Sequence, residues 1–248
     1  MEKIKLQKYF TDCGVLSRRA AEKEIADGKV KVNGVLATLG LRIDPDTDTV
    51  EYNGKLLKPQ TEERFCVMLN KPAGYVTTLS DEKGRRTVTE LVSDAGARLY
   101  PIGRLDMNSD GLLLLTNDGE LANRLTHPRH EIPKIYRVTV KGEVSEKALA
   151  ILSSPLVIDG YKIRPVKTEI IYKNKEKGST LLEMELYEGR NRQIRKMCEA
   201  ADLKVLRLMR IAYGELELGT LPSGRWRRLT RKELEYLSGS RDSLKNKE

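Results

Sequence analysis

Residues 100–119 read Tyr100-Pro101-Ile102-Gly103-Arg104-Leu105-Asp106-Met107-Asn108-Ser109-Asp110-Gly111-Leu112-Leu113-Leu114-Leu115-Thr116-Asn117-Asp118-Gly119. The four consecutive leucines predict a strand that is buried on both faces. A glycine-flanked loop delivers the carboxylate of Asp106 just before that strand. A carboxylate so close to a core is partly desolvated and able to act as a nucleophile or base. On residue type alone, however, an ordinary loop aspartate is the commoner interpretation of Asp106, and Asp118 is typical of a turn.

Strand-like segments lie on both sides of this stretch. Residues 65–69 form an apolar run that ends at Asn70-Lys71-Pro72, and further strand patterns cover 136–140, 166–172 and 181–186. Residues 145–152 have helical spacing. The pattern predicts an α+β domain over 65–238 with a mixed, largely antiparallel sheet, followed by a disordered polar tail over 239–248.

The first sixty residues predict a separate small module. Two short helices, the second with Ser17 as N-cap and Gly28 as stop, precede a hairpin whose turn is Asn33-Gly34. A polar linker over 61–64 joins this helix-helix-hairpin module, residues 1–60, to the larger domain. Basic residues gather on its second helix and following strand: Arg18, Arg19, Lys23, Lys29 and Lys31. A solvated helix face, a DNA-binding helix-turn-helix and an RNA-binding surface all remain open.

Composition narrows the classes of function. Lys and Arg number 45 against 36 Asp and Glu, a net charge of +9, and such a surplus favours a polyanionic partner. No apolar run approaches the roughly 18 residues that span a bilayer, and the N-terminus lacks the pattern of a signal peptide. We therefore expect a cytoplasmic protein with no membrane partner. The three scattered cysteines and the isolated pair His127 and His130 predict neither disulfides nor a metal site.

Two strings resemble known families. Residues 14–22, Gly-Val-Leu-Ser-Arg-Arg-Ala-Ala-Glu, with 28–34, Gly-Lys-Val-Lys-Val-Asn-Gly, resemble the alpha-L type RNA-binding module first seen in a small-subunit ribosomal protein. The string Gly-Arg-Leu-Asp-x-x-Ser-x-Gly, followed by the leucines and Thr-Asn-Asp-Gly, resembles the catalytic motif of bacterial ribosomal pseudouridine synthases, in the family typified by the small-subunit enzyme A. The resemblance spans nearly the whole chain and makes Asp106 the essential aspartate.

The same resemblance assigns roles to other residues. Tyr136 would stack on the target base and remove its proton, Arg195 would pair with Asp106, and Leu208 would lie beneath the base. From the residues alone, Tyr136 and Leu208 are equally typical of a core, and the arginines of 190–195 of a solvated or phosphate-facing row. The substrate contacts expected are Arg104, Lys71, Arg190, Arg192, Arg18, Arg19 and Lys29.

The implied reaction needs few groups. The bond from the sugar to the base nitrogen breaks, the base rotates, and a carbon–carbon bond forms at carbon five. A carboxylate attacks either the sugar or the base, and a base removes the proton from carbon five. No redox change or group transfer occurs, so we expect no cofactor and no metal.

We therefore predict a monomeric enzyme that isomerises uridine to pseudouridine in ribosomal RNA. Tyr100-Pro101-Ile102, the four leucines and Arg195 resemble the large-subunit enzyme B branch, so we expect a large-subunit rRNA substrate. A non-catalytic RNA-binding ribosome-assembly protein would account for the charge but not for the ordered set of Asp106, Tyr136 and Arg195. A nucleoside or glycoside hydrolase commonly uses two carboxylates, and the sequence offers no convincing second one.

Overall fold

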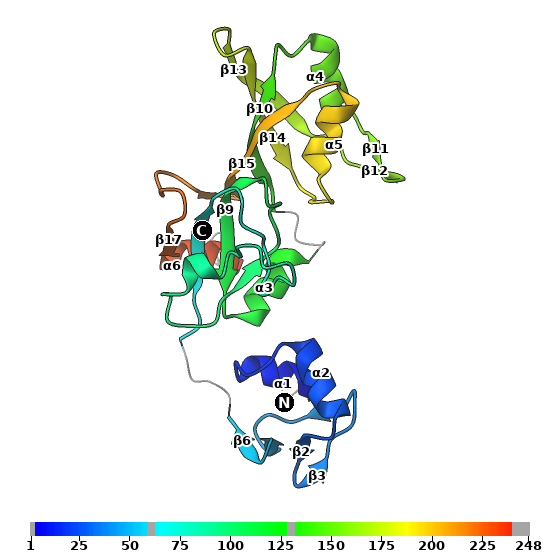
Figure 1. The fold of residues 1–248 in the computed structure, drawn as a ribbon, viewed down its shortest axis with the longest axis vertical. Coiled ribbons are helices and arrows are strands. Elements are labelled where there is room, and N and C mark those ends of the chain that lie inside the picture. Colours follow the sequence, from blue (N-terminus) through cyan, green and yellow to red (C-terminus); the bar gives the residue numbers. More distant parts are fainter. Residues whose placement is uncertain (1–2, 59–62, 128–131, 240–248) are drawn as a thin grey trace, which may run out of the picture. The chain divides into compact units, whose positions relative to one another are not determined.

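The chain divides into two compact units, residues 1–63 and 64–248, shown in Figure 1. The computed structural model describes residues 3–58, 63–127 and 132–239. Half of the expected linker, His130 and nearly all of the expected polar tail therefore lie outside the described residues. Each unit has its own core and is described by itself.

The first unit packs two helices against short strands. Its elements are β1 (Ile4–Lys5), α1 (Leu6–Asp12), α2 (Arg18–Ala26), β2 (Val30–Val32), β3 (Val35–Leu36), β4 (Arg42–Ile43), β5 (Val50–Tyr52) and β6 (Lys55–Leu57). As expected, the Ser17 side chain accepts a hydrogen bond from the Ala20 N–H at 3.2 Å and begins α2. Asn33 and Gly34, both with positive φ, connect β2 to β3.

The sheet of this unit is larger than the single hairpin expected. Four strands pair in the order β3-β2-β5-β6, and β1 pairs separately with β4. Strands of two or three residues are too short to show an alternating pattern, so sequence periodicity does not reveal them. Leu6, Phe10 and Ile25 from the helices pack with Val30 and Val50 from the strands in one buried cluster.

The second unit is built on a nine-stranded sheet. The strands of this unit are β7 (Cys66–Lys71), β8 (Tyr100–Ile102), β9 (Asp110–Thr116), β10 (Lys134–Lys141), β11 (Val157–Ile158), β12 (Tyr161–Lys162), β13 (Lys167–Asn174), β14 (Ser179–Leu186), β15 (Val205–Tyr213), β16 (Leu216–Glu217) and β17 (Trp226–Arg228). Of these, β11 and β12 form a separate two-stranded sheet. Its helices are η1 (Glu90–Val92), α3 (Gly119–Thr126), α4 (Glu146–Ser153), α5 (Gln193–Ala200) and α6 (Arg231–Leu237). The sheet order is β13-β14-β10-β15-β9-β7-β17, with β8 on β9 and β16 on β15.

Antiparallel pairing dominates this sheet, which confirms the predicted fold class. Only β9 and β15, among the named strands, run parallel, and they pair at Asp110 with Met209 and at Gly111 with Arg210. Gly111 has φ of 104°, and a Cβ there would lie 2.2 Å from the carbonyl oxygen of Arg210. Only glycine allows both this backbone conformation and this close approach, so Gly111 is required where the two halves of the sheet join.

Different layers cover the two halves. Helices α4 and α5 lie on the β13-β14-β10-β15 half (Figure 1), where Leu152 and Met197 join the strand residues in one cluster. In the other half, Leu112 and Leu114 of β9 face a cluster that includes α3 and α6, whereas Leu113 and Leu115 face residues of the 88–105 segment. The run of four leucines is buried because both faces of β9 are covered.

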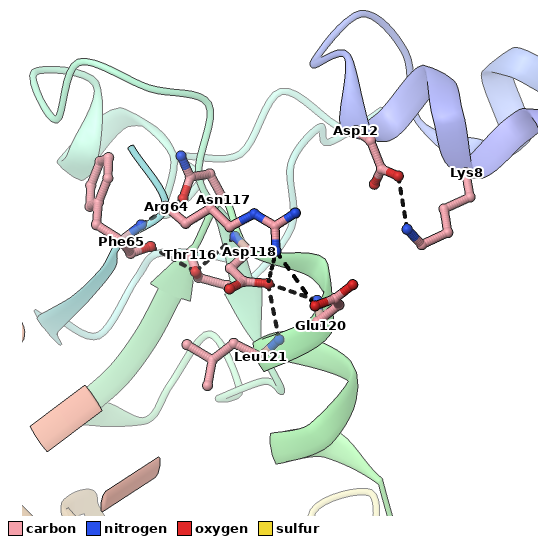
Figure 2. A network of polar contacts seen from close by, with 9 residues as sticks. All are labelled: Lys8, Asp12, Arg64, Phe65, Thr116, Asn117, Asp118, Glu120 and Leu121. Atoms are coloured by element: carbon pink, nitrogen blue, oxygen red, sulfur yellow. Dashed lines mark hydrogen bonds and ion pairs between the residues drawn. The ribbon is translucent and has the colours of Figure 1, made fainter. Parts of the chain in front are cut away.

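The end of β9 corrects one expectation. Asp118 is not simply a turn residue, because its side chain accepts hydrogen bonds from the N–H groups of Glu120 and Leu121 and so begins α3. Figure 2 shows the surrounding network. The Thr116 hydroxyl donates to the Phe65 carbonyl at 2.7 Å, and Asn117 accepts from the Phe65 N–H at 2.9 Å. These bonds tie the start of β7 to the end of β9.

The three cysteines are free and buried. Burial raises the pKa of the Cys13 thiol to about 11 and the pKa values of Cys66 and Cys198 to about 12, so these thiols are packing groups rather than nucleophiles. Within the described part of the chain, no helix has the length and apolar character needed to cross a bilayer.

Candidate active site

Asp106 lies in the loop that connects β8 to β9. The preceding residue, Leu105, is buried in a core cluster, and the Thr77 hydroxyl donates to its carbonyl at 2.7 Å. The Met107 carbonyl accepts from the Gly74 N–H at 2.7 Å, and the Ser109 N–H donates to the Asp106 carbonyl at 3.0 Å. The backbone of the loop is therefore held from several directions.

Lys71, the last residue of β7, fixes this loop from inside. Its side chain is fully buried. The Nζ donates to the carbonyl oxygens of Ser109 at 2.8 Å, Pro72 at 3.0 Å, Asp106 at 3.1 Å and Met107 at 3.4 Å. Burial lowers the pKa of Lys71 to about 8, and the charges of Asp110 and Asp106 act in the opposite direction. Lys71 was expected to contact substrate, but in this structure its ammonium is enclosed by four carbonyls and supports the loop instead.

Arg195 approaches the same loop from α5. Its Nη2 donates to the carbonyl oxygen of Asn108 at 2.7 Å. No ion pair joins Arg195 to Asp106 among the described residues, which differs from the expected pairing. The Asn108 carbonyl has no other donor within the described chain, so the guanidinium satisfies this backbone group instead. The Nε of Arg195 is buried and lacks a hydrogen-bond partner among the described atoms.

The carboxylate of Asp106 is not used in holding the loop. The residue is half-buried, and among the described residues its side chain makes no hydrogen bond or ion pair, whereas the carbonyls on either side of it are bonded. Two cations, Lys71 and Arg195, bind the loop through its backbone and leave the acid unoccupied. A fixed backbone with a free, partly desolvated carboxylate is the arrangement that a nucleophile requires.

Tyr136 and Leu208 occupy neighbouring strands. Tyr136 is half-buried on β10, pairs with Arg210 of β15, and packs against the core cluster that contains Leu105. Leu208, two residues before Arg210 on β15, pairs with Val138 and is buried in the cluster beneath α4 and α5. Tyr136 and the Asp106 loop thus share one cluster, while Leu208 lies in the adjacent one, which Tyr136 also contacts.

Two cations, the buried Arg210 and the half-buried Lys134, lie beside Tyr136 and were not anticipated from the sequence. Arg210 is 3% exposed and donates from Nε to the Leu112 carbonyl at 2.7 Å. Burial, and then the charge of Arg210, lower the pKa of Lys134 to about 8. The Lys134 Nζ lies 5.3 Å from the centroid of the Tyr213 ring. The sequence pattern of β15 predicts a strand, but it does not predict that Arg210 is buried and bonds to the neighbouring strand β9.

One ion pair also fixes the start of β9. The Nε of Arg207 donates to a carboxylate oxygen of Asp110 at 3.0 Å, and Asp110 is 9% exposed. The pair links β15 to the first residue after the Asp106 loop. Asp110 is therefore neutralised by its own partner and is a poor candidate for a second catalytic carboxylate.

The remaining expected contact residues lie on the surface. Arg104, Arg190 and Arg192 are exposed, and Arg192, with φ of 52°, precedes the first residue of α5. In the first unit, Arg18 and Arg19 are exposed at the start of α2. Lys29 is also exposed, but its Nζ is paired with Glu24 at 3.0 Å and with Asp27 at 3.6 Å. Within the described residues, no three His, Cys, Asp or Glu side chains gather as they would around a metal ion.

Comparisons with known proteins identify the family of the chain. Residues 66–200 match the family model described as RNA pseudouridylate synthase, and residues 12–48 match the S4 domain. An uncharacterized RNA pseudouridine synthase of Aquifex aeolicus is 43% identical over 96% of this chain and 94% of its own length. Ribosomal large subunit pseudouridine synthase B of Bacillus subtilis is 42% identical over 98% of both chains.

The fold has a solved counterpart. A crystal structure of a pseudouridylate synthase matches 94% of this chain and 99% of its own, with a TM-score of 0.67 and 32% sequence identity. The likeness therefore covers both the RNA-binding module and the domain that holds the aspartate loop. The chain belongs to the RNA pseudouridylate synthase family and is an isomerase with an S4 domain ahead of its catalytic domain.

Proposed function

We propose that this enzyme converts a uridine of large-subunit ribosomal RNA into pseudouridine. The substrate class is supported by the name of the Bacillus subtilis relative, which is alike over nearly its whole length, and by the S4 domain. The observation that carries the catalytic part is the aspartate loop. The buried Lys71 and the half-buried Arg195 donate hydrogen bonds to its carbonyls, and the carboxylate of Asp106 stays free.

In the proposed reaction Asp106 is the nucleophile. Its attack accompanies cleavage of the bond between the sugar and N1 of uracil. The base then rotates within the site and carbon five bonds to the same sugar carbon. The bond that the Asp106 carboxylate formed with the substrate breaks, which regenerates the free carboxylate. The proton on carbon five leaves, and N1 gains one, so product and substrate have the same composition. Tyr136 is our candidate for the group that accepts the proton from carbon five.

The other residues would bind and position the RNA. The target uridine must leave its stack, which costs about a few kcal/mol, and the apolar side chains around Tyr136 and Leu208 offset that cost. We propose that Arg104 and Arg192 contact the substrate near the flipped base. Arg195 would act as a positioning residue, because its hydrogen bond to Asn108 fixes the turn that follows Asp106.

A direct assay tests this function against its alternatives. Purified enzyme is incubated with an unmodified large-subunit rRNA transcript, and the products are analysed by nucleoside mass spectrometry and by chemical mapping of pseudouridine. We expect one or a few uridines to be isomerised without a change of mass. A binding protein would leave the RNA unchanged, and a hydrolase would leave an abasic site, so either result would contradict the proposal.

The two units would then divide the work. We propose that residues 1–60 supply affinity and placement and that residues 65–238 perform the chemistry. We also propose that the enzyme acts as a monomer in the cytoplasm, where its rRNA substrate is made. Light scattering of the purified protein, alone and with an rRNA fragment, measures the oligomeric state.

A further inference from the structure

A guanidinium–aromatic stack lies on the surface near the start of α5. The guanidinium carbon of Arg190 lies 3.0 Å from the centroid of the Tyr161 ring. Both side chains stay accessible, since Tyr161 is 44% exposed and the Arg190 side chain 42%. The reaction described above gives Tyr161 no role, and its ring differs from that of the more exposed Tyr172 in being stacked on a guanidinium.

The stack is mounted on a fixed support. Tyr161 belongs to the β11–β12 hairpin, whose Ile158 is buried in the same cluster as Ile194 of α5. Figure 1 shows this hairpin beside α5. The Arg190 N–H donates to the side chain of the buried Gln193 at 3.0 Å. Asp159, at the tip of the hairpin, is ion-paired with Lys196 of α5. The positions of both Tyr161 and Arg190 are therefore fixed by contacts with α5.

The surroundings are strongly basic. The segments 157–164 and 187–196 contain six cationic residues, Lys162, Arg164, Arg190, Arg192, Arg195 and Lys196, and two acidic ones, Asp159 and Glu188. Lys162 and Arg192 are exposed. Glu188 is partly neutralised, since it lies 3.6 Å from Arg190 and accepts from the Arg164 N–H at 3.1 Å. A basic surface that carries a flat aromatic–guanidinium pair matches the phosphates and bases of single-stranded RNA.

The stack is close to the catalytic loop along the chain. Arg190 precedes Arg195 by five residues, so their Cα atoms are at most about 18 Å apart. Arg195 in turn contacts Asn108, two residues after Asp106. An RNA strand whose uridine reaches Asp106 therefore has neighbouring nucleotides within range of this surface.

We infer that Tyr161 and Arg190 form a stacking platform for an unpaired nucleotide that flanks the target uridine. This inference rests on the proposed function and makes Tyr161 a residue of substrate recognition. The exposed π-surface receives the base, and the surrounding cations contact the adjoining phosphates. A base in a continuous duplex is already stacked on both faces, so the platform selects substrates in which this nucleotide is free.

Steady-state kinetics on an unmodified large-subunit rRNA transcript test the platform. Tyr161→Leu retains an apolar side chain of similar size on the hairpin but has no π-face. We expect its KM to rise roughly fivefold to hundredfold, as the loss of one base–aromatic stack predicts. We expect kcat to stay within about twofold of wild type, because the stack binds the ground state and the transition state equally well. Tyr161→Phe should retain the wild-type KM. Tyr172→Leu, at an exposed tyrosine of β13, is the matched control and should change neither constant.

Two further measurements separate recognition from support of the fold. Arg190→Lys keeps the positive charge but lacks the planar guanidinium group. It should raise KM without changing the salt dependence of RNA binding. Ultraviolet cross-linking followed by mass spectrometry should attach an unpaired nucleotide to Tyr161. Wild-type KM in both Tyr161→Leu and Arg190→Lys would overturn the inference, as would a loss of kcat at unchanged KM.

The outcomes also identify an incorrect partner or an incorrect reaction. A defect of Tyr161→Leu that appears only with assembled ribosomal particles would indicate a protein partner and would contradict an RNA platform. If wild-type enzyme formed no pseudouridine in naked rRNA, the proposed function would be in doubt. The cross-link would still report on the platform, since it requires binding and not turnover.

Discussion

At the scale of single residues, Asp106 combines a fixed backbone with an unoccupied carboxylate. Asp106→Asn preserves volume and polarity but removes the charge and the nucleophilic oxygen pair. We expect turnover to fall below detection while binding of rRNA stays within about tenfold, or roughly 1.4 kcal/mol. Tritium release from carbon five measures turnover, and filter binding measures affinity. Asp202→Asn, at an exposed position with φ of 57° that asparagine tolerates, should behave as wild type.

Substantial pseudouridine formation by Asp106→Asn would reject this mechanism, provided that mass spectrometry excludes deamidation back to aspartate. Normal turnover would make Asp106 an ordinary loop residue, and the RNA-binding alternative would then regain support.

Lys71 makes a second residue-scale prediction. Lys71→Met keeps the length of the side chain but leaves the carbonyls around it without their donor. We expect the free energy of unfolding of the catalytic unit to fall by on the order of 3 kcal/mol, and kcat to fall as the loop loosens. Urea denaturation measures the first effect. Lys173→Met, an exposed lysine of β13, should change stability by less than about 0.5 kcal/mol. Equal stability of the two variants would show that the carbonyls find other partners.

The residues of the site differ in how far the sequence reveals them. The string around Asp106 predicts which carboxylate is catalytic, and the segments around Tyr136 and Arg195 follow it in the order that the family resemblance implies. The sequence did not reveal that Lys71 supports the loop, because lysine is almost never fully buried. A lysine in a basic protein is therefore predicted to contact RNA. The sequence also does not reveal which group Arg195 contacts. Arg195 and the Asp106 loop are far apart in the chain, and no local sequence pattern predicts the distance between them.

At the scale of elements, the C-terminal helix α6 begins with a capping box. The Thr230 side chain accepts from the Glu233 N–H, and Glu233 accepts in turn from the Thr230 N–H. Hydrogen bonds from Arg227 hold the pKa of Glu233 at about 2, below its usual value near 4.5. A carboxylate whose pKa is lowered by folding stabilises the native state above its unfolded pKa, and this contribution is lost as pH falls through the folded pKa.

Glu233→Gln should therefore lower the free energy of unfolding by about 1–3 kcal/mol at pH 7. The difference from wild type should persist down to a pH near 4.5 and then shrink as the pH falls toward 2. Thermal denaturation at a series of pH values measures it. Glu235→Gln, in the exposed ion pair with Arg231 on the same helix, is the control and should have little effect. A difference that stayed constant to pH 2 would argue against the lowered pKa.

Element boundaries followed from sequence where the patterns were long. The strands near 65–71, 134–141 and 179–186 and the helix after Ser145 form close to where periodicity predicts them. The short strands of the first unit and the capping role of Asp118 were missed, since two-residue strands lack a period and Asn-Asp-Gly serves turns and helix starts alike.

At the scale of the whole molecule, the basic charge is distributed between a binding unit and a catalytic unit. Arg18 and Arg19 are exposed at the start of α2, whereas Lys29 is already paired with Glu24 and Asp27. If the arginines contact phosphates, replacing both with alanine in the full chain should reduce the log–log salt slope of rRNA binding by about 1.4–1.8, with kcat unchanged. Lys29→Ala should change the slope less. Titrations at several salt concentrations provide the measurement, and an unchanged slope in the double variant would mean that this face contacts something other than RNA.

The parallel pairing of β9 with β15 has a consequence for how the enzyme is made. It joins residues about a hundred positions apart in the chain, and contacts so distant in sequence form late in folding. During synthesis the loop that carries Asp106 leaves the ribosome long before the strand that braces it through Gly111 and Asp110. Since domains fold as units as they emerge, we expect the nascent polypeptide to remain inactive until β15 is released. A product terminated before β15 would have Asp106 without the strand that orients its loop.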